Sequence, residues 1–301
     1  MKASPALAIV TRAMFPMRER RHASGRSSRA TSRGVGVVLM LVVACLPGLG
    51  RAQDDAELSQ KSQNPVADLI SVPFEHHLNF GAGPGKDLQY LLQAQPVIPF
   101  RLTRDWNLIS RTIVPLLYQP ELAPGFGDVF GLGDIQQSLF LSPARPGQVF
   151  WGGQVFWGVG PILQFPSATD DALGQGKWGA GPTAAALTIQ GPWLVGGLIA
   201  NVWSFAGDDD RPDVNQMLIQ PIVTYTFPGA WFLESVPMIT VDWKADGDDR
   251  WTVPLGGGVG KLVRLGKLPV SASVGAYYNV VRPDNAAEWQ LRIRILFLFP
   301  R

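Results

Sequence analysis

Two arginines near the end of the sequence are the first residues whose type and spacing could do chemistry. Arg292 and Arg294 stand two positions apart in "WQLRIRILFLFP" (289–300), among Leu, Ile and Phe. A strand places positions two apart on one face, so both guanidinium groups would oppose Ile293 and Ile295. On that face they could pair with carboxylates or select among solutes that pass them.

Other residues are weaker candidates for catalysis or metal binding. His76 and His77 are adjacent, so in a strand they point to opposite faces and cannot hold one metal ion together. The sequence has no G-x-S-x-G motif and no distinctive Ser beside a His, so nothing in it indicates a hydrolase. The carboxylates of 208–210 and 246–249 suit hard cations, but their spacing matches no EF-hand loop. Solvated loops that bridge to lipopolysaccharide through divalent ions explain them more simply, so we expect no enzyme, no metal site and no cofactor.

A glycine-rich segment, "PLGGGVGK" (254–261), does not fit a phosphate-binding loop, because it lies in a predicted strand rather than before a helix. Glycines in such a context favour close packing or curvature of a wall.

The composition narrows the class of protein that must position these residues. The chain has 33 Gly and 25 Pro among 301 residues, and residues that break helices are too frequent here for a helical protein. One Cys excludes a disulfide framework and a multi-Cys metal site. Residues 1–52 hold nine Lys and Arg and one acid. The remainder, 53–301, has 17 basic and 23 acidic residues, a net charge of −6, so nothing favours nucleic acid as a partner.

The first 52 residues have the design of a signal peptide. Six arginines between positions 18 and 33 precede an apolar run, "GVGVVLMLVVACLPGLG" (34–50), and a small-residue cleavage site follows at Ala52. The basic region is long enough for synthesis to start at Met14 or Met17. Two alternatives stay open: a transmembrane anchor, although the run is short for about 20 residues of spanning helix, and a lipoprotein signal processed at Cys45. Each alternative exports the chain from a bacterial cytoplasm.

Beyond the leader, apolar and polar residues alternate in segments that turn signals separate. In 214–227, for example, Met217 and Ile219 oppose Gln216 and Gln220. The segments are long for soluble strands of about 5–6 residues and suit tilted membrane strands of about 9–11 residues. The twelve predicted strands are 69–80, 88–100, 105–117, 132–142, 149–164, 177–189, 192–205, 214–227, 231–243, 250–263, 268–281 and 288–299.

The connections between these strands alternate in kind. One set is short, such as "PGA" (228–230), and the other is mostly longer and acidic, such as "KADGDDR" (244–250). Short turns at one end and long loops at the other are typical of outer-membrane barrels, whose short turns are periplasmic. The sequence therefore predicts an all-β, transmembrane, antiparallel up-and-down β-barrel of about twelve strands at 69–301. A short periplasmic segment, 53–68, would precede it as a helix that partly plugs the barrel.

Tryptophans cluster near the predicted strand ends, as the aromatic girdles of a membrane barrel require. Only Trp157 is placed in the middle of a strand. The predicted membrane-interface aromatics are Trp106, Trp151, Trp178, Trp193, Trp203, Trp231, Trp243, Trp251 and Trp289.

The barrel prediction assigns the two opening arginines to the lumen. On the lipid face each Arg would cost about 2–4 kcal/mol at the bilayer midplane. Inside, Arg292 and Arg294 could meet water or the carboxylates of Glu234 and Asp242, either to hold the lumen together or to select what passes. The predicted lumen-lining residues are Gln93, Gln95, Arg111, Gln154, Gln220, Glu234, Asp242, Arg292 and Arg294.

Several segments resemble the bacterial outer-membrane barrels of the "MetA-pathway of phenol degradation" family, some of whose members are labelled neuromedin U. The segments include "QKSQNPVADLISVPF" (60–74), "DWNLISRTIVP" (105–115), "GLGDIQQSLFLSP" (131–143), "NVWSFAGD" (201–208) and "WKADGDDRWTVPLGGGVGK" (243–261). The resemblance covers nearly all of 60–301 and implies an outer-membrane location. Because some genes of this family are associated with aromatic catabolism, it also implies uptake of hydrophobic or aromatic compounds. It supplies no catalytic motif.

The predicted function is a channel or transporter for passive uptake of small hydrophobic or aromatic molecules. The alternative is a structural or adhesive barrel whose filled lumen conducts nothing. The expected partners are outer-membrane lipid and lipopolysaccharide of a Gram-negative bacterium, the barrel-assembly machinery and a small hydrophobic solute.

Overall fold

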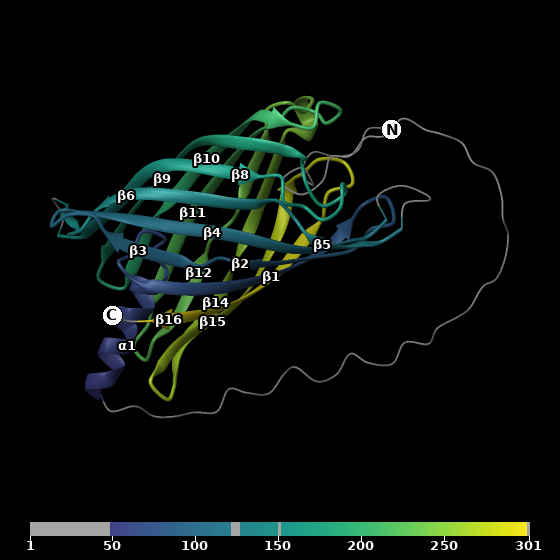
Figure 1. The fold of residues 1–301 in the computed structure, drawn as a ribbon. Helices are drawn as coiled ribbons and strands as arrows, with labels where there is room; N and C mark the ends of the chain where they lie inside the picture. Colours follow the sequence, from purple (N-terminus) through teal and green to yellow (C-terminus); the bar gives the residue numbers. More distant parts are fainter. Residues whose placement is uncertain (1–48, 122–126, 150–151, 300–301) are drawn as a thin grey trace, which may run out of the picture.

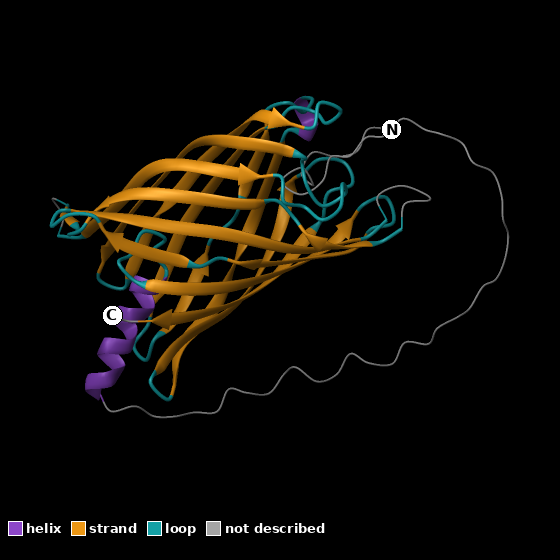
Figure 2. Ribbon diagram, viewed as in Figure 1, coloured by secondary structure: helices purple, strands orange, loops and turns teal. Residues whose placement is uncertain are grey.

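The computed structural model describes residues 49–121, 127–149 and 152–299, and within these ranges the chain forms one closed antiparallel sheet (Figures 1 and 2). The sheet closes because its first and last strands pair, from Ile70 with Phe299 to Phe80 with Trp289. Successive strands along the chain are neighbours in the sheet. The predicted all-β, up-and-down barrel is therefore confirmed.

The strands tilt across the barrel wall, and the longer loops gather at the end opposite the single long helix of the described chain (Figure 2). In chain order the elements are α1 (Leu49–Ser62), β1 (Ile70–Ala82), β2 (Asp87–Ala94), β3 (Val97–Arg101), β4 (Trp106–Gln119), β5 (Val129–Leu132), β6 (Ile135–Pro143), β7 (Gly147–Gln148), β8 (Gln154–Phe165), β9 (Lys177–Gln190), β10 (Trp193–Gly207), β11 (Asn215–Thr226), β12 (Trp231–Ser235), β13 (Ile239–Asp242), η2 (Gly247–Asp249), β14 (Trp251–Leu265), β15 (Leu268–Val281) and β16 (Trp289–Phe299).

These sixteen strand segments of the described chain build twelve barrel strands, because three strands are interrupted. β2 and β3 are parts of one strand, as are β5, β6 and β7, and as are β12 and β13. Pro96 and Pro237 fall in two of the interruptions, where a residue without an N–H cannot continue the ladder. The count of twelve matches the prediction. The predicted strand 149–164 was placed too early, since β8 begins at Gln154.

Tryptophans lie on the outer surface at both ends of the strands. At the short-turn end are Trp106, Trp193 and Trp231, and Trp157 joins them because its ring packs edge-on against that of Trp106, 5.9 Å between centroids. The mid-strand placement of Trp157 was therefore wrong. At the long-loop end are Trp178, Trp203, Trp243, Trp251 and Trp289. Trp151 lies outside the described residues.

Helix α1 lies at the short-turn end of the barrel (Figure 1), where it contacts β14 and β11. Asp55 Oδ1 accepts a hydrogen bond from Arg264 Nε at 2.6 Å, and Leu58 packs on a buried cluster that includes Leu296 and Leu298. No helix of the described ranges is long and apolar enough to cross a bilayer. Residues 1–48 lie outside these ranges, so the signal peptide and its processing at Ala52 or Cys45 stay predictions.

Candidate functional site: the lumen below the N-terminal segment

The inner surface of the barrel carries two different walls. Strand alternation aims the polar residues of β1, β12, β15 and β16 at one side of the lumen. We call this side the charged wall, made of Glu75, His77, Glu234, Ser273, Tyr277, Arg292 and Arg294. Strands β3 to β10 form the other side with apolar side chains. We call it the apolar wall, made of Val97, Ile109, Phe140, Ile162, Ala185, Leu198, Ala200 and Val202.

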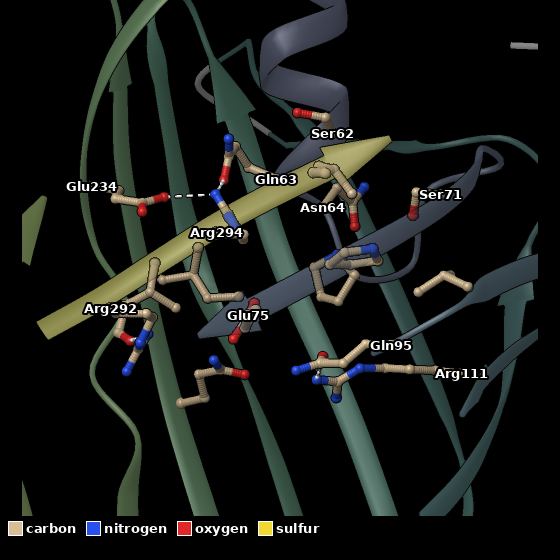
Figure 3. A pocket seen from close by; sticks show the side chains of 17 residues that line it. Ser62, Gln63, Asn64, Ser71, Glu75, Gln95, Arg111, Glu234, Arg292 and Arg294 are labelled. Carbon is tan, nitrogen blue, oxygen red and sulfur yellow. Dashed lines mark hydrogen bonds and ion pairs between the residues drawn. The ribbon is translucent and has the colours of Figure 1, made fainter. Parts of the chain in front are cut away.

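A segment of the chain's own N-terminal region lies between the two walls. We call residues 63–66, directly after α1, the plug. Below it lies a cavity of about 80 Å³, which has room for only a few water molecules. Figure 3 shows polar side chains that converge on this cavity from the plug and from the surrounding strands: Ser62, Gln63, Asn64, Ser71, Glu75, Gln95, Arg111, Glu234, Arg292 and Arg294.

Arg294 joins the plug to the charged wall. Its Nη2 lies 2.7 Å from Glu234 Oε2 and also donates to Gln63 Oε1 (Figure 3). Ser273 Oγ donates to the other carboxylate oxygen of Glu234 at 2.8 Å. Both charged side chains are largely buried, with exposed fractions of 15% for Arg294 and 7% for Glu234. A pair so removed from water depends on both partners, because either charge alone would be left uncompensated.

Arg292 holds a different set of partners one step along the same face. Its Nη1 donates to the Val236 carbonyl at 2.8 Å, and its Nη2 donates to Gln290 Oε1 at 3.0 Å. The guanidinium carbon lies 4.5 Å from the centroid of the Tyr277 ring, within the range of a cation–π contact. None of these partners is a carboxylate, so the direct contacts of the Arg292 guanidinium are with neutral groups.

Glu75 and His77 complete the charged wall on β1. Their inward side chains stand across the ladder from Arg294 and Arg292 respectively, and His77 Nε2 lies 3.5 Å from Glu75 Oε2. On the far side of the cavity, Arg111 Nη2 donates to Gln95 Oε1 at 2.7 Å. Three arginines and two glutamates thus face the cavity, so its lining carries an excess of positive charge.

Val66 anchors the plug to the apolar wall. It is 3% exposed and belongs to the same buried cluster as Ile109, Phe140 and Leu198. A Cβ built on Gly158 would lie 3.2 Å from Val66 Cγ1, so the absence of a side chain at Gly158 makes room for the valine. The plug thus touches the apolar wall through Val66 and the charged wall through Gln63.

The structure brings most of the sequence-predicted lumen residues to this cavity. Those that line it are Gln95, Arg111, Gln220, Glu234, Arg292 and Arg294. Gln93 lies next to it and accepts a hydrogen bond from Gln95 Nε2 at 2.9 Å. Gln154 is exposed at the start of β8, and Asp242 ends β13, where its carboxylate accepts from the Lys244 amide at 2.9 Å. Of the two carboxylates that the sequence offered to Arg294, it is Glu234 that pairs with it, whereas Asp242 lies near the long-loop end of the barrel.

Sequence reasoning missed Glu75 and Tyr277. The alternation in 69–80 already placed Glu75 and His77 on one face and His76 on the other, and counting that face would have found them. The segment 53–68 was expected to be a helix that partly plugs the barrel; the helix ends at Ser62, and the residues directly after it line the cavity. Its contacts could not be predicted, because a short segment without periodicity does not reveal what it packs against.

The outer loops pack on a buried arginine instead of remaining fully solvated. Arg211 is 8% exposed, and its guanidinium donates to the carbonyls of Asp171, at 2.9 Å, and Gly174. Nearby, Asp134 accepts hydrogen bonds from the amides of Gln175 at 2.6 Å and Ala168 at 3.2 Å. Burial raises the pKa of the Asp134 carboxyl above its ordinary value, against these amides, which lower it. Over the described ranges, no three His, Cys, Asp or Glu side chains gather as a metal site.

A closed barrel with an apolar, tryptophan-framed exterior and charged side chains only on its inner face at membrane depth is the construction of an outer-membrane β-barrel. The chain is therefore a protein of the bacterial outer membrane. No protein-family model matches it, and no curated protein matches it.

Among solved structures, the chain is similar to the COG4313 outer membrane channel from Pseudomonas putida F1, with 17% identity, 77% of this chain and 95% of that chain covered, and a TM-score of 0.57. This likeness shows a shared fold. The KdgM porin (10% identity, 76% and 99% covered, TM-score 0.40) is too distant to support an inference. The same holds for outer membrane phospholipase A from Escherichia coli (14%, 77% and 90%, TM-score 0.42).

Proposed function

We propose that this barrel is a passive channel for small molecules with an apolar body, and that the plug closes it at rest. The observation that carries the proposal is the lining of the cavity, which combines apolar with charged side chains. The apolar ones are Val97, Ile222, Val236 and Leu296, and the charged ones are Glu75, Arg111, Glu234, Arg292 and Arg294. A molecule with an apolar body can lie against Val97 and Ile222 while a polar group meets Arg111 or Arg292. Such a lumen suits solutes that are neither fully polar nor fully apolar.

The N-terminal segment has the contacts that a removable plug requires. At the cavity it is held to the barrel by side-chain hydrogen bonds, such as that from Arg294 to Gln63, rather than by a strand ladder. The apolar anchor is one valine, and burying such a side chain contributes about 1.5–3 kcal/mol. Contacts of that size hold a segment in place while still allowing it to leave.

Aromatic or other hydrophobic compounds are the solute class that we propose. The two-faced lumen supports this choice. So does the resemblance of 60–74 and 243–261 to the barrels of the phenol-degradation family, and the fold shared with an outer membrane channel is compatible with it. We place this chain in that family as part of the same proposal.

A cross-link that fixes the plug tests the proposal directly. A Val66→Cys/Gly158→Cys pair in a Cys45→Ser background has suitable geometry, because the Gly158 Cβ position lies 3.2 Å from Val66 Cγ1. In planar bilayers we expect the oxidised pair to be silent and the reduced pair to show conductance steps. Small aromatic solutes should reduce the ionic current of the reduced form as they occupy the lumen. Equal conductance in both redox states would refute a gating plug.

A second candidate is a barrel that conducts nothing, and the small size of the cavity favours it. About 80 Å³ is much less than the roughly 300–1,000 Å³ of ordinary ligand pockets. In that case, plug and walls would form one permanent core. Removal of residues 53–66 would then yield a barrel that unfolds more readily and still passes no current. The channel proposal expects steady conductance from the same truncated protein.

A further inference from the structure

The charges that line the cavity are not matched one to one. Its lining carries three arginines and two glutamates, and one pair, Arg294 with Glu234, is in contact at 2.7 Å. Among the described residues, no carboxylate oxygen lies within 4.0 Å of the guanidinium nitrogens of Arg111 or Arg292. Two positive charges at the cavity therefore lack an ion-pair partner.

Arg111 is the less engaged of these two arginines. Arg292 donates to a backbone carbonyl and to Gln290, and it lies over an aromatic ring. Arg111 donates through Nη2 to Gln95 Oε1 at 2.7 Å (Figure 3), and its other N–H groups have no hydrogen-bond acceptor among the described residues. A guanidinium carries five N–H donors in a planar fork, so most of the binding capacity of Arg111 is unused.

The surroundings of Arg111 are apolar, which strengthens its attraction for an anion. Arg111 pairs with Val97 across the ladder, and Ile109, two positions away on the same inner face, is buried. Both neighbours belong to the apolar wall. A charge in such surroundings is poorly solvated, so a charge-assisted hydrogen bond to a carboxylate gains strength there. Arg111 thus places a positive charge where the apolar body of a solute would lie.

Gln95 fixes the direction of the Arg111 side chain. It is a buried residue whose Oε1 accepts from Arg111, while its Nε2 donates to Gln93 Oε1 at 2.9 Å. A neutral amide orients the guanidinium without neutralising it, so the charge stays available to a ligand. Gln95 is therefore a positioning residue.

The cavity accommodates a head group but not a whole solute. Its volume is about 80 Å³, whereas a cavity of about 150 Å³ is needed to hold benzene. Gln63 and Asn64 of the plug form part of its lining. The body of an amphiphile would therefore take the space that the plug occupies, next to a head-group site that is already formed in the closed barrel.

We infer that Arg111, oriented by Gln95, is a head-group site in the lumen and that it binds a carboxylate. The solutes that the lumen prefers are then anionic amphiphiles, in which an apolar body carries one carboxylate, over neutral or cationic compounds with the same body. A planar carboxylate matches the guanidinium fork with two parallel hydrogen bonds. The inference rests on the proposed channel function for the passage of such solutes and adds the charge of the solute to it.

Three solutes that share one aromatic ring and differ in head-group charge test the site: benzoate, benzyl alcohol and benzylammonium. Each is added to the full-length barrel in planar bilayers, and the concentration that halves the ionic current is measured. We expect benzoate to act at a concentration about tenfold lower than the other two, which is the effect of one charge-assisted contact. In detergent, benzoate should also raise the midpoint of thermal unfolding more than the other two, because a ligand that binds the folded state stabilises it.

Two variants remove the site in different ways. Arg111→Gln removes the positive charge, and Gln95→Glu supplies an internal carboxylate beside Arg111. Both should bring benzoate to the level of benzyl alcohol. Glu75→Gln removes a negative charge that faces the same cavity and should strengthen the benzoate effect by about two- to fivefold. Arg104→Gln, at an exposed position in the turn between β3 and β4, is the matched control and should change nothing. Heat-dependent mobility on SDS gels shows which variants are folded.

The outcomes separate the head-group site from the channel. Equal effects of the three solutes on the current would refute the site and leave the channel proposal intact. A preference for benzoate that survives both Arg111→Gln and Gln95→Glu would assign the charge to another residue and overturn the inference. If bilayers stay silent while benzoate raises the unfolding midpoint of the wild type but not of Arg111→Gln, the site stands and the proposed channel fails. Absence of both the current and the thermal shift would refute both.

Discussion

The charged wall and the apolar wall enclose the same lumen but are held together by different physics. In the charged wall, Arg294 and Glu234 are fixed by directed bonds at 2.7 Å. In the apolar wall, Phe140 and Ile162 are fixed by packing, with exposed fractions of 0% and 5%. Directed bonds specify one geometry and break at a defined atom, whereas packing tolerates sliding and loses energy gradually. The plug touches both walls, so it can be loosened in two independent ways.

The difference between the walls also explains which lumen-facing residues could be predicted from the sequence. A charged residue within an apolar strand stands out, and it can be placed on a face from its spacing alone. An inward Ile or Phe does not stand out from an outward one, because both faces of such a strand are then apolar.

The largest effect is expected in the apolar wall, where Phe140→Ala should leave a cavity. Removal of a fully buried Phe costs about 3–5 kcal/mol of unfolding free energy. Urea unfolding of the detergent-solubilised barrel measures this loss. The matched control is Leu141→Ala, because Leu141 faces lipid with 39% exposure and lipid chains can fill the space that it vacates. If the two variants lose the same stability, Phe140 is not part of a packed inner wall.

The second-largest effect is expected on β16, where neighbouring residues face lipid and lumen in turn. Ile293→Arg should impair membrane insertion, because an arginine on the lipid face costs about 2–4 kcal/mol near the midplane. Arg294→Leu, one residue along, should still insert, since it adds no charge to that face. Heat-dependent mobility on SDS gels reports folded barrel for both variants. Equal tolerance of both changes would mean that the strand lacks a single lipid face.

Much of the fold could be predicted from the sequence because a membrane barrel obeys strict local rules. The alternation in 214–227 and 288–299 gave the faces, and the alternating lengths of the connections gave the topology. The tilt of the wall does not alter either signal. The interruptions at Pro96 and Pro237 were visible as prolines, but whether a proline breaks a strand or only bends it depends on its neighbours across the sheet.

The candidate site was harder to predict, because it depends on contacts between distant parts of the chain. Glu234 and Arg294 were expected to be close, and they are, at 2.7 Å. The contact between Gln63 and Arg294 joins residues 231 positions apart, and no spacing rule points to it. Arg292 was expected to meet water or a carboxylate, yet the Val236 carbonyl, between β12 and β13, and the Tyr277 ring hold it instead.

A smaller effect is expected when the charged wall loses one charge without losing shape. Glu234→Gln keeps an acceptor for Ser273 but removes the ionic partner of Arg294, which should cost about 1–3 kcal/mol. Arg294→Leu together with Glu234→Gln should recover stability relative to Arg294→Leu alone, because no carboxylate is then left unpaired. Unfolding in urea measures each variant. Glu288→Gln is the control, since its bond to Lys86 is exposed and screened by solvent. Failure of the double change to recover stability would show that the pair is not coupled.

The smallest change concerns the plug and bears directly on how the two walls cooperate. Val66→Ala removes two buried methyl groups from the contact with the apolar wall and leaves Gln63 and its bond to Arg294 in place. A loss of about 1 kcal/mol raises the population of the open state by about fivefold, so single-channel records should show longer open times at unchanged unitary conductance. Val159→Ala makes the same chemical change on the lipid face, where Val159 is 46% exposed, and should leave the open time unaltered. If Val66→Ala instead changes the unitary conductance, Val66 lines the open path and is not a removable anchor. If neither quantity changes while Glu234→Gln lengthens the open time, the charged wall alone holds the plug.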